Sequence, residues 1–293
     1  MDWTPIVTDI RDRFDLTLDA ALARPVGGGC INLCWVISGA GARWFLKTNT
    51  SDMAAMFEAE ARGLAALSEA GPLRVPAMIG CGCVGPHAYL LLEWIPLRTS
   101  SRGAEAVLGA GLARLHRATS AQFGFDSDNF IGSTAQPNGW YASWADFFAQ
   151  RRLGFQLDLA RDKGLGGRLQ EAGEHLLQVL PELFAEHAPQ PSLLHGDLWG
   201  GNWACDEQGR PVIFDPAVYF GDREADLAMT RLFGGFGSDF YAAYEDEWPL
   251  PPGASGRVDL YNLYHALNHA NLFGGAYRDQ ALAIMRRLLS SQR

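Results

Sequence analysis

Residues 193–216 read LLHGDLWGGNWACDEQGRPVIFDP. The segment HGDLWGGN inside it has the spacing H-x-D-L-x-x-x-N, which places Asn202 five residues after Asp197. The carboxylate of Asp197 can orient and deprotonate an acceptor hydroxyl, and the amide oxygen of Asn202 can bind a metal ion. The spacing therefore indicates a catalytic loop. His195, which precedes this loop, is expected to be a hydrogen-bonded scaffold residue and not a titrating catalyst.

The second half of the stretch predicts a β-hairpin. A short strand at Trp203 is followed by the turn sequence Asp-Glu-Gln-Gly and by the apolar run 212–214, which leads to Asp215. A hairpin brings Asp215 back beside Asn202, and two oxygen ligands of this kind suit Mg²⁺. Aspartate is also common in turns, so either acid taken alone fits a turn residue better than a functional one.

A second group of candidate residues lies upstream. The glycine-rich turn GGGCIN contains Gly28, Gly29 and Cys30, and such a turn lets backbone N–H groups approach a phosphate. Lys47 ends the strand RWFLK, and Glu60 falls on the apolar stripe of the next helix, where a carboxylate needs a partner. Taken singly, these charges fit solvent-exposed side chains. In this order, the turn, the lysine and the glutamate predict a clamp for nucleotide phosphates.

The apolar periodicity predicts an α+β fold with two lobes. Strand patterns and one helix occupy roughly the first ninety residues, whereas helical patterns dominate from about residue 103 onward. We therefore place a small β-rich lobe at residues 1–93 and a large, mainly helical lobe at residues 94–293. Ligands are expected to bind at the junction. The helical patterns include WYASWADFFAQRRL, residues 140–153.

Composition narrows the class of protein. Hydrophobic residues make up 48% of the chain and charged residues 19%, which are the values of a folded globular protein. The formal net charge of −9 argues against a general nucleic-acid or membrane-surface binder. The acidic amino terminus does not fit a signal peptide, and the apolar runs are too short for a membrane span. The five cysteines, an odd number, fit a reduced and cytoplasmic protein.

Several segments carry a family resemblance. The strings HGDLWGGN, DPAVYFGDREADLAM and LNHANLFGGAY resemble the fructosamine (ketosamine) 3-kinase family, in the small-molecule branch of the protein-kinase-like fold. The strings GGGCIN, MFEAEARGL and YLLLEWIP match it too, so the resemblance runs almost end to end. The HGD…N…D pattern alone is shared with aminoglycoside and choline kinases. The elements specific to the fructosamine 3-kinase family are the residues around Trp199, the string DPAVYFGDREADLAM and the LNH at residues 267–269.

The resemblance implies an ATP- and Mg²⁺-dependent kinase that phosphorylates the third carbon of a ketosamine, on a glycated amine or a glycated protein. The phosphorylated adduct would be prone to spontaneous elimination, which is a route to deglycation. The implied roles are phosphate binding by Lys47, paired with Glu60; adenine binding by the backbone of Glu93, Trp94 and Ile95; proton abstraction by Asp197; metal binding by Asn202 and Asp215; and sugar contacts by Trp199 and His269.

Two positions depart from the family pattern. Asp222 stands where many relatives carry histidine, and Leu272 replaces a histidine that some relatives carry shortly after LNH. Both differences leave the choice of sugar open. Arg223 and Asp226 are expected to brace loops and not to touch substrate, because clustered acids and arginines often form ion-pair networks.

Two alternatives stay open at this stage. One is an aminoglycoside or other small-alcohol phosphotransferase of the same fold, whose cleft would be expected to carry more acids for a polycationic drug. The other is a nucleotide-binding pseudokinase, against which the intact set of Lys47, Glu60, Asp197, Asn202 and Asp215 argues.

Cys30 is a candidate redox site because it directly follows three glycines of the predicted phosphate turn. Thiols near backbone N–H groups and a lysine can react as thiolates, whereas free cysteine is also often a small buried hydrophobe. Oxidation would add bulk where phosphates must bind, or link two chains, so both a monomer and a redox-linked dimer are compatible with the sequence. Comparing the turnover of wild type and Cys30→Ala before and after oxidation tests this role.

Overall fold

The computed structural model describes residues 2–27, 31–39, 41–99 and 103–290. It divides into two compact units. Unit 1 comprises residues 1–104 and 203–216, and unit 2 comprises residues 105–202 and 217–293. The α+β class with a β-rich first part and a helical second part is confirmed. This division differs from a boundary at residue 93. The first unit extends to residue 104 and also includes residues 203–216, the segment predicted to form a hairpin.

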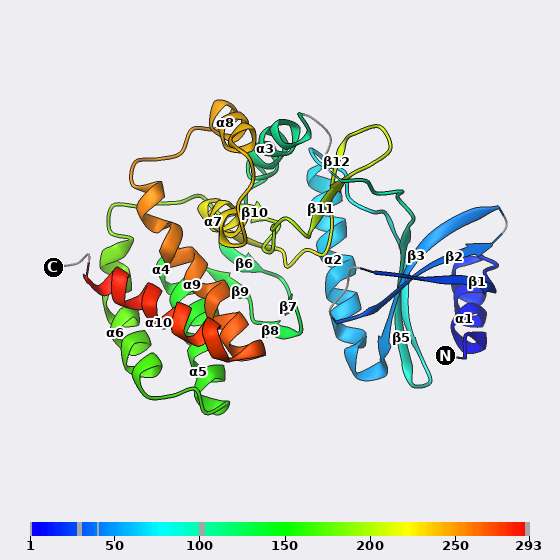
Figure 1. Ribbon diagram of the computed structural model, residues 1–293, viewed down its shortest axis with the longest axis horizontal. Helices are drawn as coiled ribbons and strands as arrows, with labels where there is room; N and C mark the ends of the chain where they lie inside the picture. The colour runs from blue at the N-terminus through cyan, green and yellow to red at the C-terminus, as the bar shows by residue number, and fades with distance from the viewer. Residues whose placement is uncertain (1, 28–30, 40, 100–102, 291–293) are drawn as a thin grey trace. The chain divides into compact units, whose positions relative to one another are not determined.

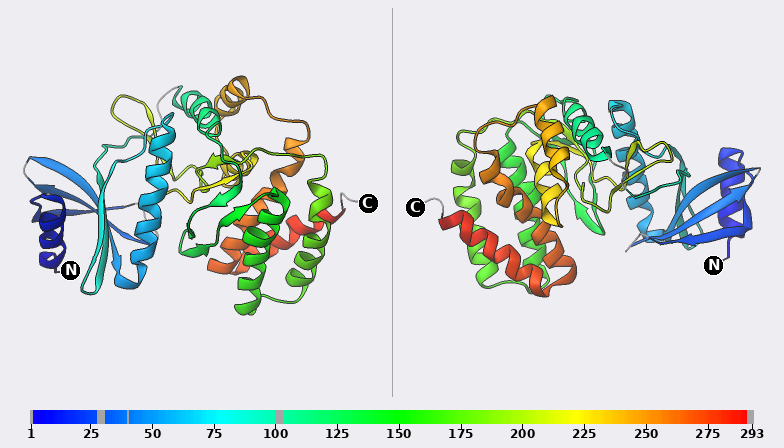
Figure 2. Two further views of the ribbon diagram at one scale, coloured as in Figure 1. Left: turned by 180° about the vertical axis from the view of Figure 1, so that it is seen from behind. Right: turned by 45° about the horizontal axis from the view of Figure 1, so that its top comes forward.

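Unit 1 is built on a five-stranded antiparallel sheet with the strand order β1-β2-β3-β5-β4. Helices α1 and α2 lie on opposite faces of this sheet (Figures 1 and 2). The elements are α1 (Thr4–Phe14), β1 (Asp19–Val26), β2 (Leu33–Gly39), β3 (Ala42–Thr50), the short 3-10 helix η1 (Ser51–Met53), α2 (Ala54–Ala70), β4 (Met78–Val84), β5 (His87–Glu93), β11 (Trp203–Cys205) and β12 (Pro211–Ile213).

The core of unit 1 follows from strand alternation. Leu46 of β3 and Leu91 of β5 are fully buried in one cluster with Ile6 and Ile10 of α1. Neighbouring residues on these strands face the opposite side, toward α2. Gly80 of β4 allows close packing, since a Cβ at this position would lie 2.1 Å from the ring of Phe14. The sheet is therefore covered on both faces, and one residue step along β3 moves a side chain from the α1 side to the α2 side.

Unit 2 combines a small sheet with a helical core. The strands β10, β13, β6 and β9 form a four-stranded sheet in this order, and β7 and β8 form a separate hairpin. Helix α9 packs against α5, α7 and α10. The elements are α3 (Ala104–Leu115), β6 (Phe123–Phe125), β7 (Asn129–Ile131), β8 (Thr134–Gln136), β9 (Gly139–Tyr141), α4 (Trp144–Phe147), the π-helix η2 (Phe148–Gly154), α5 (Phe155–Asp162), α6 (Arg168–Leu183), β10 (Ser192–Leu194), β13 (Tyr219–Gly221), α7 (Glu224–Leu232), α8 (Ser238–Glu247), α9 (Ala254–Phe273) and α10 (Gly275–Ser290).

One predicted helix begins later than expected. Trp140 and Tyr141 belong to strand β9, which pairs with β6, and the helix starts only at Trp144. The reason is the residue before that start. The side chain of Ser143 accepts a hydrogen bond from the N–H of Asp146 at 3.2 Å, which caps the helix there. Trp140, in strand β9, is 44% exposed, whereas Trp144, in the helix, is buried in the core.

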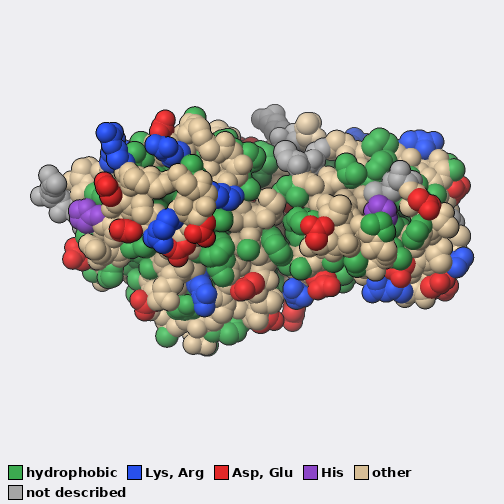
Figure 3. All heavy atoms as spheres, turned by 90° about the horizontal axis from the view of Figure 1, so that it is seen from below, with side chains coloured by type: hydrophobic (Ala, Val, Ile, Leu, Met, Phe, Trp, Pro, Cys, Tyr) green, Lys and Arg blue, Asp and Glu red, His purple; other side chains and the backbone are tan. Residues whose placement is uncertain are grey.

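Acidic and basic side chains are interspersed with hydrophobic ones on the face shown in Figure 3. Within the part of the chain that the structure describes, none of the helices has both the length and the apolar character needed to cross a bilayer.

Candidate active site

Lys47 is the centre of the first group of candidate residues, in unit 1. Its neighbour Leu46 enters the core beside α1, so Lys47 faces α2, which carries Glu60. The Nζ atom of Lys47 lies 2.7 Å from Oε1 of Glu60 and 2.5 Å from Oδ1 of Asp215. The side chain of Lys47 is only 6% exposed and that of Glu60 only 11%. The contact predicted between these two residues is therefore present as a buried ion pair.

The two carboxylates keep this lysine charged. Burial by itself would lower the pKa of Lys47, but the nearby charges of Glu60 and Asp215 raise it above its ordinary value. Burial also raises the pKa of Glu60, and the charge of Lys47 opposes that shift. A lysine that stays charged in a buried position can bind a phosphate group as a point charge.

Asp215 has two features typical of a functional acid. Its side chain is 42% exposed, so its carboxylate can reach a ligand as well as Lys47. Its φ angle is +57°, in the left-handed region that few residues other than glycine adopt. Such backbone conformations occur preferentially at functional sites. The predicted hairpin before it is confirmed, with Trp203 of β11 paired with Ile213 of β12.

The segment predicted to bind adenine follows β5. The carboxylate of Glu93 accepts hydrogen bonds from Arg74 at 2.7 Å and from the N–H of Ala77 at 3.2 Å. Ile95 is buried, and the buried indole N–H of Trp94 has no hydrogen-bond partner among the described residues. The side chain of Glu93 is therefore occupied by structural contacts, which leaves the main chain as the candidate contact for a base.

The turn predicted to cover the phosphates connects β1 to β2, which are antiparallel neighbours. Gly28, Gly29 and Cys30 lie outside the described residues. Their nucleotide contacts, and the redox role of Cys30, stay predictions.

The catalytic-loop residues Asp197 and Asn202 are brought together in unit 2. The amide nitrogen of Asn202 donates to the main-chain oxygen of Asp197 at 2.8 Å and to its carboxylate at 3.2 Å. With its nitrogen engaged in this way, Asn202 has its amide oxygen left as the candidate metal ligand. The loop also needs Gly196, whose φ is +81° and at which a Cβ would lie 2.0 Å from the carbonyl oxygen of Ala217.

Asp226 of α7 fixes the start of this loop. Its buried carboxylate accepts the backbone N–H groups of His195 at 2.7 Å and Gly196 at 2.8 Å, and it lies 3.1 Å from Nε2 of His116. Burial would raise the pKa of Asp226, but the hydrogen bond and charge of His116 lower it below its ordinary value. Asp226 is thus a positioning residue that braces the loop just before Asp197. Arg223 is likewise held by internal partners, the carbonyl oxygens of residues 248 and 249.

An aromatic cluster links the two residues expected to contact the sugar. Phe233, at the end of α7, lies between them, with its ring centroid 6.0 Å from that of Trp199 and 5.0 Å from that of His269. The His269 ring in turn contacts Phe273 at 5.7 Å and Tyr277 at 5.1 Å. Trp199 and His269 are therefore joined on one surface of unit 2. Sequence reasoning did not find Phe233, whose only signal was an aromatic residue before the glycine pair at the end of α7.

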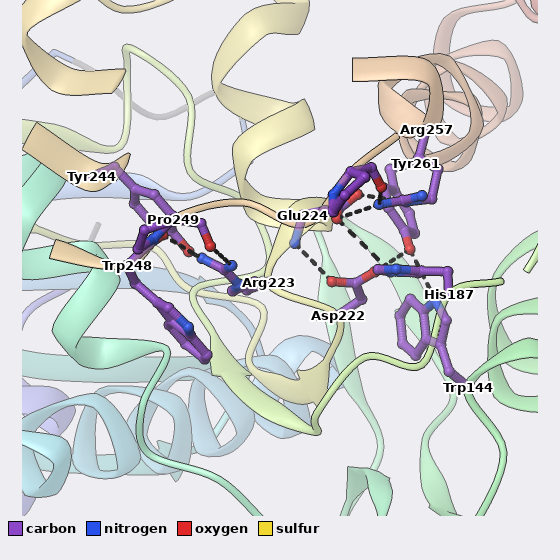
Figure 4. A network of polar contacts seen from close by, with 11 residues as sticks. Trp144, His187, Asp222, Arg223, Glu224, Tyr244, Trp248, Pro249, Arg257 and Tyr261 are labelled. Atoms are coloured by element: carbon purple, nitrogen blue, oxygen red, sulfur yellow. Dashed lines mark hydrogen bonds and ion pairs between the residues drawn. The ribbon is translucent and has the colours of Figure 1, made fainter. Parts of the chain in front are cut away.

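Asp222 belongs to a polar network inside unit 2 (Figure 4). Its carboxylate lies 2.5 Å from Nε2 of His187 and accepts hydrogen bonds from the hydroxyl of Tyr261 and from the N–H of Glu224. The carboxylate of Glu224 binds the guanidinium of Arg257 at 2.7 and 2.8 Å. Every carboxylate in this network has partners, so Asp222 is held in unit 2 by internal contacts.

His265 predicts a measurable pH dependence of stability. Burial, together with the charge of His269, lowers its pKa to about 3, from an unfolded value near 6.5. The pKa of His265 is lower in the folded state than in the unfolded state. The contribution of neutral His265 to the unfolding free energy is therefore complete above about pH 6.5 and is lost as the pH falls toward 3. Between pH 7 and pH 5 this loss amounts to about 2 kcal/mol of unfolding free energy.

Urea denaturation at pH 7 and pH 5 tests this expectation. His265→Gln should show a decline in stability that is smaller than the wild-type decline by about 2 kcal/mol. The control is His175→Gln, at an exposed position of α6, which should retain the wild-type decline. A His265→Gln protein with the full wild-type decline would contradict the assignment.

The fold and these side chains define a kinase of the protein-kinase-like class. The crystal structure of an aminoglycoside phosphotransferase in complex with AMP-PNP and hygromycin B superposes with a TM-score of 0.62 at 17% identity, covering 97% of this chain and 98% of that one, which shows the shared fold. The chain belongs to the fructosamine kinase family, whose model, described as "Fructosamine kinase", matches residues 2–291.

Individual relatives agree with this assignment. The chain is 46% identical over 267 residues to a Synechocystis protein named "Probable ketoamine kinase slr1563", covering 91% of this chain and 90% of the relative. It is also 46% identical over 263 residues to the chloroplastic protein-ribulosamine 3-kinase of Arabidopsis thaliana, covering 89% of this chain and 80% of the relative. A Haemophilus somnus crystal structure named "Putative fructosamine-3-kinase" gives a TM-score of 0.88 at 30% identity, covering 98% of this chain and 97% of that one.

Proposed function

We propose that the protein is an ATP-dependent ketosamine 3-kinase, which phosphorylates the sugar part of a glycated amine or glycated protein. The observation that carries this proposal is the intact phosphotransfer set. Lys47 is held by Glu60 and Asp215, and the amide nitrogen of Asn202 is bound to the carboxylate of Asp197. The names of the relatives support a ketosamine as the acceptor.

In this proposal Lys47 binds the α- and β-phosphates of ATP, and Glu60 keeps its ammonium group in place. Asp215 and the amide oxygen of Asn202 are the metal ligands. Two such oxygens fit Mg²⁺, which takes the rest of its coordination shell from water and phosphate. Bound Mg²⁺ supplies charge neutralisation at the phosphates. The main chain of Glu93, Trp94 and Ile95, and that of Gly28, Gly29 and Cys30, completes the nucleotide site.

Asp197 acts on the acceptor. Its carboxylate orients the hydroxyl on the third sugar carbon and takes its proton as the oxygen attacks the γ-phosphorus. The bond from the γ-phosphorus to the bridging oxygen breaks, a bond to the sugar oxygen forms, and ADP leaves. After a proton is lost from the first sugar carbon, the 3-phosphate can leave as inorganic phosphate, and water then hydrolyses the imine formed at the first carbon, which releases the amine and a 3-deoxy dicarbonyl compound. Deglycation is the proposed outcome of the reaction.

The competing functions receive less support. The aminoglycoside phosphotransferase resembles this chain only at the level of the fold, at 17% identity. A pseudokinase would have no need for the buried lysine–glutamate pair together with a loop that presents both a carboxylate and an amide oxygen.

A panel of acceptors tests the proposed function. With Mg²⁺ and ATP, we expect ADP release with fructosamine, ribulosamine or erythrulosamine adducts and much less with free ketoses or kanamycin-type aminoglycosides. More efficient phosphorylation of the aminoglycosides than of the ketosamines would overturn the proposal.

A further inference from the structure

The aromatic cluster of Trp199, Phe233, His269, Phe273 and Tyr277 is accessible to a ligand. The exposed fractions of the residues are 39% for Trp199, 42% for Phe233 and 65% for Phe273. The cluster adjoins the catalytic loop through the chain itself, since Trp199 is the second residue after Asp197. A substrate whose hydroxyl lies at Asp197 therefore has aromatic rings beside it.

His269 contributes a hydrogen-bond acceptor to this cluster. Its Nδ1 lies 2.8 Å from the main-chain oxygen of His265. A carbonyl oxygen only accepts, so Nδ1 carries the proton, and Nε2 of the neutral ring has a free lone pair. The ring that contacts Phe233 and Tyr277 can thus accept a hydrogen bond from an N–H or O–H group of a ligand.

The proposed acceptor differs from a free sugar by one charged group. The nitrogen of a ketosamine is bonded to the first sugar carbon, next to the ketone, and as an alkylamine it is a cation when protonated. Aromatic faces attract cations, with a gain of about 0.5–2 kcal/mol per ring contact, and they give no such gain to a neutral ketose. A neutral imidazole nitrogen can accept one of the N–H groups of the same cation.

We propose that the aromatic cluster is an ammonium subsite, in which Phe233 is a specificity-determining residue and His269 accepts a hydrogen bond from the protonated amine. This inference rests on the proposed function and adds to it the feature of the substrate that the protein selects. It explains how one surface distinguishes a ketosamine from the corresponding free ketose.

Steady-state kinetics with two acceptors test the subsite. One acceptor is an N-alkyl ribulosamine, and the other is its neutral analogue, in which a methylene group replaces the nitrogen. Phe233→Leu keeps an apolar side chain and removes the aromatic face. It should raise KM for the ribulosamine by about 2- to 30-fold, the equivalent of one cation–π contact, with kcat and KM for ATP little changed.

Three comparisons complete the experiment. With the neutral analogue, Phe233→Leu should raise KM by less than about twofold. Phe233→Tyr, which keeps the aromatic face, should have the wild-type KM for both acceptors. Trp140→Leu, at an exposed tryptophan that contacts Phe220 in the small sheet, should change KM for neither acceptor. An equal loss with both acceptors, or no loss with either, would overturn the ammonium subsite alone. A wild-type protein that phosphorylates neither acceptor would overturn the proposed function and this inference with it.

Discussion

Replacing Asp197 with asparagine is expected to lower turnover with a ketosamine by about 10²–10⁴-fold, the usual contribution of a positioned general base. The substitution keeps the size of the side chain and its place in the loop, where Asn202 donates to it. Binding of ATP should be unaffected because the proposed nucleotide contacts lie on other residues. The measurement is kcat together with the dissociation constant of a nucleotide analogue.

A matched control separates chemistry from a general loss of charge. Asp162 lies at an exposed position of the same unit, at the end of α5, and Asp162→Asn should have wild-type turnover. Near-wild-type turnover in Asp197→Asn would remove Asp197 from the role of base.

Replacing Asp215 with asparagine is expected to impair the use of Mg·ATP. Removing a group that merely supports a metal ligand typically costs about 10–100-fold in metal affinity or activity, so the loss of a direct ligand should reach at least that size. Asparagine tolerates left-handed backbone conformations, so the φ of +57° does not prevent the substitution. The diagnostic measurement is the dependence of turnover on Mg²⁺ concentration, which should shift to higher concentrations.

The chain offers a control for the backbone of this variant. Among the described residues, Asp15 is the other non-glycine residue with a positive φ, at +55°, and it lies at the exposed end of α1 in the same unit. Asp15→Asn should leave the Mg²⁺ dependence unchanged. An unchanged Mg²⁺ dependence in Asp215→Asn as well would contradict its assignment as a metal ligand.

The sequence predicted the contacts that depend on local periodicity. The pairing of Lys47 with Glu60 followed from a charged residue on the apolar stripe of the helix after the strand, and the ion pair is present. The contact of Lys47 with Asp215 joins residues 168 positions apart, and no local pattern could indicate it. The hairpin before Asp215 was predictable because its turn residues and apolar run are adjacent in the chain.

Other features were beyond sequence reasoning for identifiable reasons. The strands β6 to β9 have three residues each, too few for an alternating pattern to appear, so the predicted start of the helix at Trp140 was wrong and the helix begins at Trp144. Phe233 directly follows α7, His269 lies on α9, and Trp199 is far from both in sequence, so the place of Phe233 between the two rings depends on how α7 and α9 pack. The aromatic cluster is a property of the tertiary structure.

The position of the transferred phosphate tests the central claim most directly. The protein is incubated with Mg²⁺, ATP and a ribulosamine, and the product is examined by phosphorus NMR with proton coupling. The account predicts a phosphate ester coupled to the hydrogen on the third sugar carbon, formed at least about 10²-fold more slowly with Asp197→Asn, followed by release of the free amine. A phosphate on another carbon, or ATP hydrolysis without a sugar phosphate, would contradict it.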